Sequence, residues 1–121
     1  MFAALDAAFD RRDLDSVLDL CTEDVLFIGS GDGEEAIGRY AIGPMFAGLS
    51  SRLDSVDFAV AWEDVSVEVI GDVALLNASG RATLVTPNRD DRFGYRLTGV
   101  LLLRDGRWLW RVHHGSEPGR W

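Results

Sequence analysis

Four extended runs joined by short turns fill the second half of the sequence and constrain its fold more than any other feature. The runs span residues 56–70, 72–86, 92–104 and 107–116. Asp105-Gly106 joins the last two runs and is a strong hairpin signal, because both residue types tolerate the backbone angles of a two-residue turn. Gly71-Asp72 joins the first two runs, and residues 87–91 link the two pairs. We therefore predict an antiparallel meander of four strands.

The first half of the sequence has mostly helical spacing. Apolar residues over 2–9 predict a first helix, and Asp13 is a suitable N-cap for a second. Residues 25–28 predict a short buried strand, and the glycine-rich GSGDGEE at 29–35 has capping-box spacing ahead of a third helix that ends near Leu49. A long sheet must bury one face, and these helices are the segments that can cover it. The expected fold is α+β, with three N-terminal helices packed in a curved antiparallel sheet.

Size and charge narrow the classes of protein that this chain can be. With 121 residues, 47% of them hydrophobic, the chain is expected to form a single domain over residues 1–121. The formal net charge of −8 repels nucleic-acid backbones and anionic membranes, so neither is an expected partner. Cys21 is the only cysteine, and no leader pattern or apolar run of 18 residues occurs. We expect a cytoplasmic protein.

Several motifs along the chain carry a family resemblance. Arg-Asp-Leu-Asp at 12–15, Glu-Asp-Val-Leu-Phe at 23–27, a glycine-rich turn and a long meander resemble a SnoaL-like domain of the nuclear transport factor and ketosteroid isomerase-like superfamily. The most specific motifs, Arg-Asp-Gly-Arg-Trp at 104–108 and His-x-Ser-x-Pro at 114–118, also resemble the hub domain of calcium/calmodulin-dependent protein kinase. The resemblance implies a cone-shaped barrel with a pocket between helices and sheet, and a dimer formed through the outer face of the sheet.

Counting outward from the Asp105-Gly106 turn assigns residues of the last two strands to a face of the sheet, because side chains alternate along a strand. One face is apolar and is expected to line the pocket. It pairs Leu103 with Trp108, Leu101 with Trp110, Gly99 with Val112 and Leu97 with His114. The opposite face is mixed and suits a subunit contact, so we expect a homodimer through it.

The same counting from Gly71-Asp72 places Glu63 beside Gly80 on the pocket face. The link at 87–91 does not fix the register between the two hairpins, and a slip by one residue would invert the assignment. The expected ligand is a small hydrophobic molecule. Its expected binding residues are Trp110, Gly99, Leu97, Leu101, Val112, Ser116, Gly80 and Phe27.

The adjacent pair His113 and His114 raises the question of a metal site. Successive strand residues point to opposite faces, so the two rings cannot share a metal ion unless the strand bulges. No nearby cysteine, third histidine or spaced carboxylate pair completes a ligand set, and we expect no metal and no cofactor. His114 is the functional candidate, because the alternation of side chains along the strand places it on the pocket face. Its alternative role is that of a neutral, hydrogen-bonded core histidine.

Three residues are candidate proton carriers: His114, Glu63 and Tyr95. A carboxylate in an apolar lining would have a raised pKa and could act as a base near neutral pH. The alternative for Glu63 is a bulge that turns it to solvent, in which case Asp64 would take its inward place.

The catalytic residues of ketosteroid isomerase do not carry over. The position of its base falls nearest Gly29, its tyrosine falls near Leu5, and its second aspartate falls near Gly99 or Val100. Three classes of function therefore remain open. The first is a cofactor-free isomerase, cyclase or dehydratase that acts by general acid/base chemistry. The others are a non-catalytic ligand-binding domain and a dimerisation domain of the hub kind.

Overall fold

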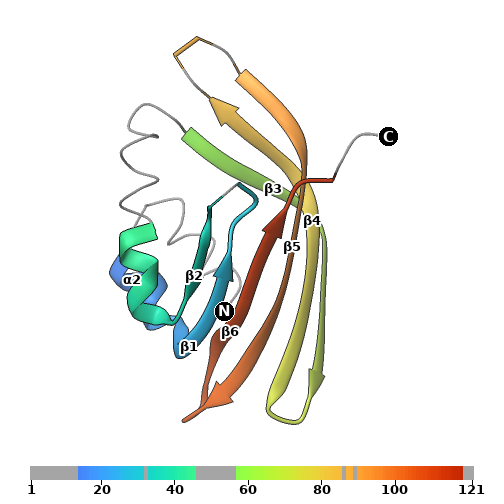
Figure 1. The fold of residues 1–121 in the computed structure, drawn as a ribbon. Helices are drawn as coiled ribbons and strands as arrows, with labels where there is room; N and C mark the ends of the chain where they lie inside the picture. The colour runs from blue at the N-terminus through green and yellow to red at the C-terminus, as the bar shows by residue number, and fades with distance from the viewer. Residues whose placement is uncertain (1–13, 32, 46–56, 86, 89, 119–121) are drawn as a thin grey trace.

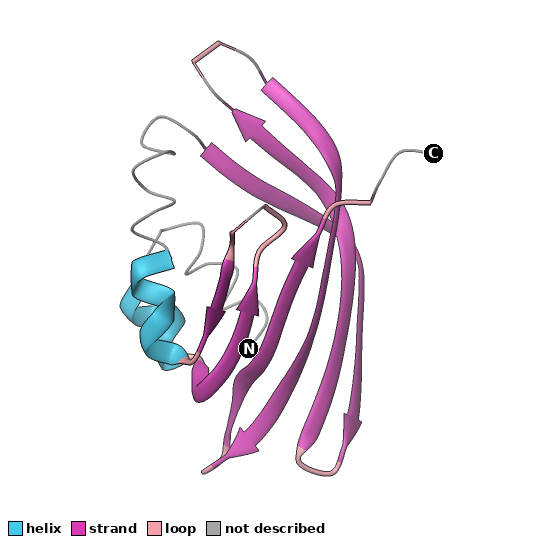
Figure 2. Ribbon diagram, in the orientation of Figure 1, coloured by secondary structure: helices cyan, strands magenta, loops and turns pink. Residues whose placement is uncertain are grey.

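The computed structural model describes residues 14–31, 33–45, 57–85, 87–88 and 90–118. Within these ranges one curved sheet of six strands carries helical segments on its concave side (Figures 1 and 2). Helix α2 (Leu14–Asp19) is the predicted second helix, and residues 39–45 are also helical. The first predicted helix, at 2–9, lies outside the described residues.

The predicted meander is confirmed. Its strands are β3 (Asp57–Ile70), β4 (Val73–Val85), β5 (Asp90–Arg104) and β6 (Arg107–Ser116). Asp105 and Gly106 adopt φ angles of 51° and 75°, as a tight hairpin turn requires, and Gly71 adopts 60° in the turn between β3 and β4.

The expectation of a purely antiparallel sheet is wrong. Strand β1 (Cys21–Ile28) lies parallel to β6, and the strand order is β2-β1-β6-β5-β4-β3. The start of the third helix also differs from the prediction. Glu35–Ile37 form the short strand β2, which pairs antiparallel with β1, and the helical residues begin at 39. The capping-box spacing therefore belongs to a β-turn and strand.

Two bulges interrupt the alternation of side chains. In β6, Trp110 pairs with Leu101 but Val112 pairs with Val100, so Arg111 is an extra residue. In β3, Asp64 pairs with Ser79 but Trp62 pairs with Gly80, so Glu63 is an extra residue. An extra residue in one strand reverses which side chains face the core from that point onward.

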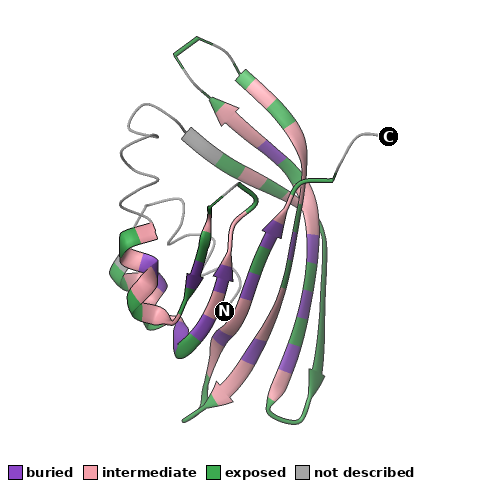
Figure 3. Ribbon diagram, viewed as in Figure 1, coloured by how far each residue is buried: buried purple, intermediate pink, exposed green. Residues whose placement is uncertain are grey.

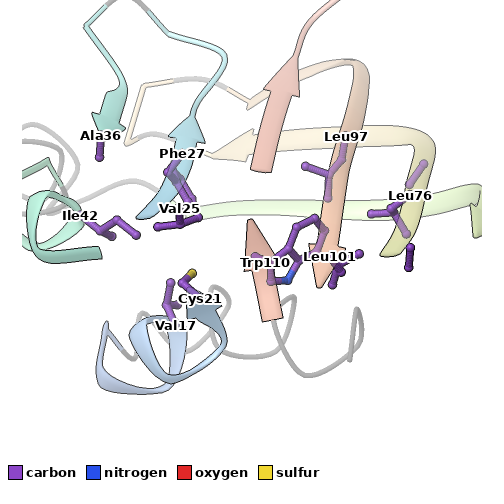
Figure 4. Close-up of a cluster of buried hydrophobic side chains, with 12 residues drawn as sticks. Val17, Cys21, Val25, Phe27, Ala36, Ile42, Leu76, Leu97, Leu101 and Trp110 are labelled. Atoms are coloured by element: carbon purple, nitrogen blue, oxygen red, sulfur yellow. The ribbon is translucent and has the colours of Figure 1, made fainter. Parts of the chain in front are cut away.

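The core lies between the concave face and the helical segments (Figures 3 and 4). Its centre is the indole of Trp110, which is fully buried and packs with Leu101 from the neighbouring strand. The other buried members of this cluster are Val17, Cys21, Val25, Phe27, Ala36, Ile42, Ala74, Leu76, Ala78 and Leu97. The backbone N–H of Trp110 donates to the carbonyl of Leu20 at 2.7 Å, which fixes the end of α2 against β6. In the described part of the chain, no helix has the length and apolar character to cross a membrane.

Candidate functional site

The bulge at Arg111 exchanges the roles expected of the two histidines. His113 pairs with Gly99 and is 7% exposed on the inner face, whereas His114 pairs with Thr98 and is exposed. The predicted inward orientation of His114 is therefore wrong. Val112 and Ser116, which follow the bulge, pair with Val100 and Arg96 and so also lie on the outer face. The bulged Arg111 forms an ion pair with Asp24 of β1, with 3.2 Å between Nε and Oδ2.

His113 is enclosed by aromatic rings. Its imidazole stacks on Phe27 with the ring centroids 4.4 Å apart, and it meets Trp110 edge-on at 4.9 Å. Phe27 is its direct neighbour across the parallel β1–β6 pair, so the strand register creates the stack. Burial lowers the pKa of His113 to about 3, so the ring is neutral at physiological pH. It is a core residue and does not carry protons near neutral pH.

The bulge in β3 has the same effect on the predicted carboxylate. Glu63 is directed to solvent beside Arg81, with 3.8 Å between Oε1 and Nε, so the alternative of a bulge at Glu63 is confirmed and its inward placement is wrong. Asp64 does not replace it, because Asp64 pairs with Ser79 and is exposed. Trp62 takes the inward place opposite Gly80. Trp62 could have been identified from the sequence, because a large side chain needs the space that a glycine on the next strand leaves.

The space beside two glycines that were expected to contact a ligand is already occupied by the chain itself. A Cβ on Gly99 would overlap the indole of Trp110, and a Cβ on Gly80 would overlap the backbone of Ala61. The lack of a side chain at these glycines therefore lets other parts of the chain pack closely against them, and does not leave space for a ligand. Leu97, Leu101 and Trp110, also predicted to contact a ligand, are buried core residues.

Tyr95 is the one predicted proton carrier that the structure places on the inner face. It pairs with Gly80, and its ring meets Trp62 edge-on at 6.2 Å. The ring leans toward β6, where a Cβ on Gly115 would overlap its hydroxyl. Burial is the main cause that raises the pKa of Tyr95 to about 12; the charge of Glu34 adds to it and a hydrogen bond with Ser30 opposes it. The hydroxyl is therefore protonated near neutral pH.

Three further polar residues lie around this hydroxyl, and together with Tyr95 we call them the Tyr95 cluster: Tyr95, Ser30, Glu34 and Glu117. The hydroxyl of Ser30 donates to Oε1 of Glu117 at 3.4 Å. The backbone N–H of Gly31 donates to Oε2 of Glu34 at 2.6 Å. Ser30 and Glu117 follow the carboxyl ends of β1 and β6, which meet because these strands are parallel. Neither residue could be identified from the sequence, because nothing in it predicts that pairing.

The glycine-rich turn does not offer a site for phosphate. The carboxylate of Glu34 folds back over the turn, and a Cβ on Gly29 or on Gly31 would collide with it. The position that an anion would need is thus held by a negatively charged side chain. Among the described residues, no group of three or more histidine, cysteine, aspartate or glutamate side chains could hold a metal ion.

Comparisons with known proteins agree with this architecture. The family model of the SnoaL-like domain matches residues 1–119. No curated protein sequence matches the chain. A candidate dehydratase of the NTF2-like family from Streptomyces avermitilis superimposes with a TM-score of 0.82 at 19% identity, covering 98% of this chain and 91% of that one.

Two further solved structures have the same fold. ActVI-ORFA from Streptomyces coelicolor has a TM-score of 0.81 at 16% identity, covering 99% of this chain and 91% of that one. A candidate calcium/calmodulin-dependent protein kinase II association domain from Xanthomonas campestris has a TM-score of 0.81 at 23% identity, covering 99% and 84%. These similarities establish the NTF2-like cone fold for this chain.

Proposed function

Because the chain belongs to the SnoaL-like domain family, we propose that its inner face binds a small hydrophobic molecule through the Tyr95 cluster. The observation that carries this proposal is the position of the half-buried Tyr95, whose hydroxyl lies over Gly115 near Ser30 and two carboxylates. Binding sites for small molecules combine apolar walls with a few polar groups that fix the orientation of the ligand. Trp62 supplies an apolar wall, and Tyr95 and Ser30 supply the polar groups.

The chemistry that fits these groups is general acid/base catalysis on a carbonyl compound. A protonated tyrosine can donate to a carbonyl oxygen and stabilise the negative charge that develops when an adjacent proton is removed. Glu117 is the candidate base in this scheme, because it accepts only a long hydrogen bond of 3.4 Å from Ser30, whereas Glu34 accepts a short one of 2.6 Å from the backbone of the turn. Isomerisation, cyclisation and dehydration all use such a pair and need no cofactor. The solved relative named as a candidate dehydratase has the same fold.

Ligand binding is tested with Nile red, a neutral apolar dye that carries a carbonyl group. We expect the parent chain to bind the dye, and Tyr95→Phe to weaken binding about three- to tenfold, as loss of one hydrogen bond requires. Tyr40→Phe is the matched control, because Tyr40 is the other tyrosine of the chain and is exposed. Equal affinity of parent and Tyr95→Phe would remove Tyr95 as the anchor.

Catalysis needs a separate experiment, since a binding protein would pass the dye test. Deuterium incorporation next to the carbonyl of 2-tetralone, followed by NMR in heavy water, reports proton abstraction directly. We expect exchange above the buffer rate in the parent chain, and a loss of about 10²-fold or more in Tyr95→Phe and in Glu117→Gln. Exchange at the buffer rate in the parent, together with dye binding, would assign a non-catalytic binding role for this ketone class.

A second candidate function, dimerisation, is supported by the outer face of the sheet. Leu75 is exposed there, next to Val100 of β5, which in turn pairs with Val112 of β6. Leu102 and Leu109 continue this apolar surface as another cross-strand pair. We propose that two copies associate through this face. Sedimentation should give a dimer at micromolar concentration for the parent and a monomer for Leu102→Glu; a monomeric parent would refute the proposal.

A further inference from the structure

Strand β3 forms one edge of the sheet, and beyond its bulge it is long and regular. Residues 64–70 pair one to one with residues 73–79 of β4, and no described strand pairs with their other side. Such an edge presents backbone N–H and C=O groups that can pair with another extended chain. The bulge at Glu63 ends this regular part, so the available edge is about seven residues long.

The side chains of this edge are unusually apolar on one face. Val65, Val67 and Val69 are 50%, 48% and 59% exposed. Their partners on β4, which are Ala78, Leu76 and Ala74, are buried. Figure 3 shows this change from buried to exposed across the pair of strands. The inner apolar face of the sheet therefore ends in an uncovered row of three valines.

The same segment is strongly acidic. Residues 57–72 include no lysine or arginine. The acids on the regular edge and its turn are Asp64, Glu68 and Asp72, all exposed. Arg81 of β4 is an exposed base near this segment, and it lies beside Glu63 on the bulge. The edge therefore combines a row of valines on one face with the exposed acids Asp64 and Glu68 on the other, where Ile70 is also exposed.

From these features we infer that residues 64–70 bind a basic, extended segment of a partner protein by β-strand addition. Main-chain hydrogen bonds to the free edge supply affinity, and alternating side chains supply specificity. Apolar side chains of the partner extend the valine row, and its intervening basic side chains face Asp64 and Glu68. A second copy of this chain fits less well, because it brings the same acids to the interface and adds a net charge of −8.

A synthetic peptide tests this inference directly. The probe is a blocked, dye-labelled peptide of seven residues that alternates valine and arginine, and binding is followed by fluorescence anisotropy. We expect saturable binding that weakens as salt is raised, with Val67→Lys weakening it about tenfold or more. Ile37→Lys is the matched control, because Ile37 is exposed on the opposite edge strand, β2. Amide NMR signals of residues 64–70 should shift on binding.

Two peptide controls separate strand addition from charge attraction alone. A peptide that is N-methylated at every residue keeps its charge but has no N–H donor on either edge, so it cannot pair. A peptide with glutamate in place of arginine can pair but is repelled. Neither should bind. Glu68→Arg serves as a second variant if Val67→Lys is unfolded by circular dichroism, and it should also weaken binding about tenfold.

The inference is overturned if the N-methylated peptide binds as well as the original, or if the shifted amide signals lie outside β3. It is also overturned if no peptide binds while Val67→Lys converts a dimer to a monomer, since the edge would then pair with a second copy.

Discussion

The imidazole ring of His113 lies parallel to the phenyl ring of Phe27, with 1° between their planes and 4.4 Å between their centroids. The two residues are 86 positions apart in the sequence and are direct neighbours across the parallel β1–β6 pair. The stack depends on the bulge at Arg111, since regular alternation from Trp110 would turn His114 and not His113 to the inner face. One extra residue in a strand therefore selects which histidine enters the core.

The buried His113 should make stability depend on pH. Its pKa is lowered from 6.5 to about 3 in the folded chain, so between these values the unfolded chain binds a proton that the folded chain does not. The free energy of unfolding should therefore fall by about 1.4 kcal/mol per pH unit as pH drops below 6.5. Urea unfolding at several pH values should show this slope reduced in His113→Asn. It should persist in His114→Asn, and a slope equal in all three chains would contradict the buried placement of His113.

Gly115→Ala should displace the hydroxyl of Tyr95. The added Cβ overlaps this hydroxyl, so the ring must move and the free energy of unfolding should fall by about 1–3 kcal/mol. A double-mutant cycle checks the cause. In the Tyr95→Phe background the same substitution should cost less, because the overlapping oxygen is gone. Equal costs in both backgrounds would show that Gly115 is required for another reason.

Gly99→Ala should destabilise the core. The added Cβ would overlap the indole of Trp110, which is fully buried and has no room to retreat. We expect a loss of about 1–3 kcal/mol and a change in tryptophan emission. Gly94→Ala on the same strand is the matched control, because its Cβ would make an ordinary contact of 3.5 Å with Pro118. If both substitutions cost the same, Trp110 does not fill the space above Gly99.

The thiol of Cys21 should be unreactive in the folded chain. It is 1% exposed, so a reagent cannot reach it. Burial also raises its pKa to about 12, so the reactive thiolate does not form near pH 8. Labelling with Ellman's reagent should therefore follow unfolding, with a rate that rises when urea is added. Rapid labelling without denaturant would show that β1 opens locally.

The strand order of the meander and the first rows of its hairpins could be predicted because tight turns fix register locally. The pairs Leu103–Trp108 and Leu101–Trp110 follow from Asp105-Gly106, and Val69–Ala74 follows from Gly71. Each prediction fails at the next bulge along the strand. The extra residue Arg111 carries no local signal, and the bulge at Glu63 was indicated only by the rarity of buried glutamate. Beyond both residues the inward and outward sets are exchanged.

Long-range pairing limited the prediction of the site. Tyr95 could be chosen from the sequence because it continues the alternation of Leu97 and Gly99 toward the start of β5. Its neighbours Ser30 and Glu117 could not be chosen, because only the parallel contact of β1 with β6 brings them together. The prediction of a helix start at the turn 29–34 was wrong for a related reason. Its acidic residues match a helix cap in spacing, but Glu34 folds back onto the turn and a strand follows.

The parallel contact between β1 and β6 also sets the order in which the chain can fold during synthesis. Residues 21–28 leave the ribosome early and can pair only with β2 until residues 107–116 follow. The place of β1 between β2 and β6 is therefore completed last. Until β6 is made, the nascent chain carries one unpaired edge of β1. Contacts of such wide sequence separation also slow folding.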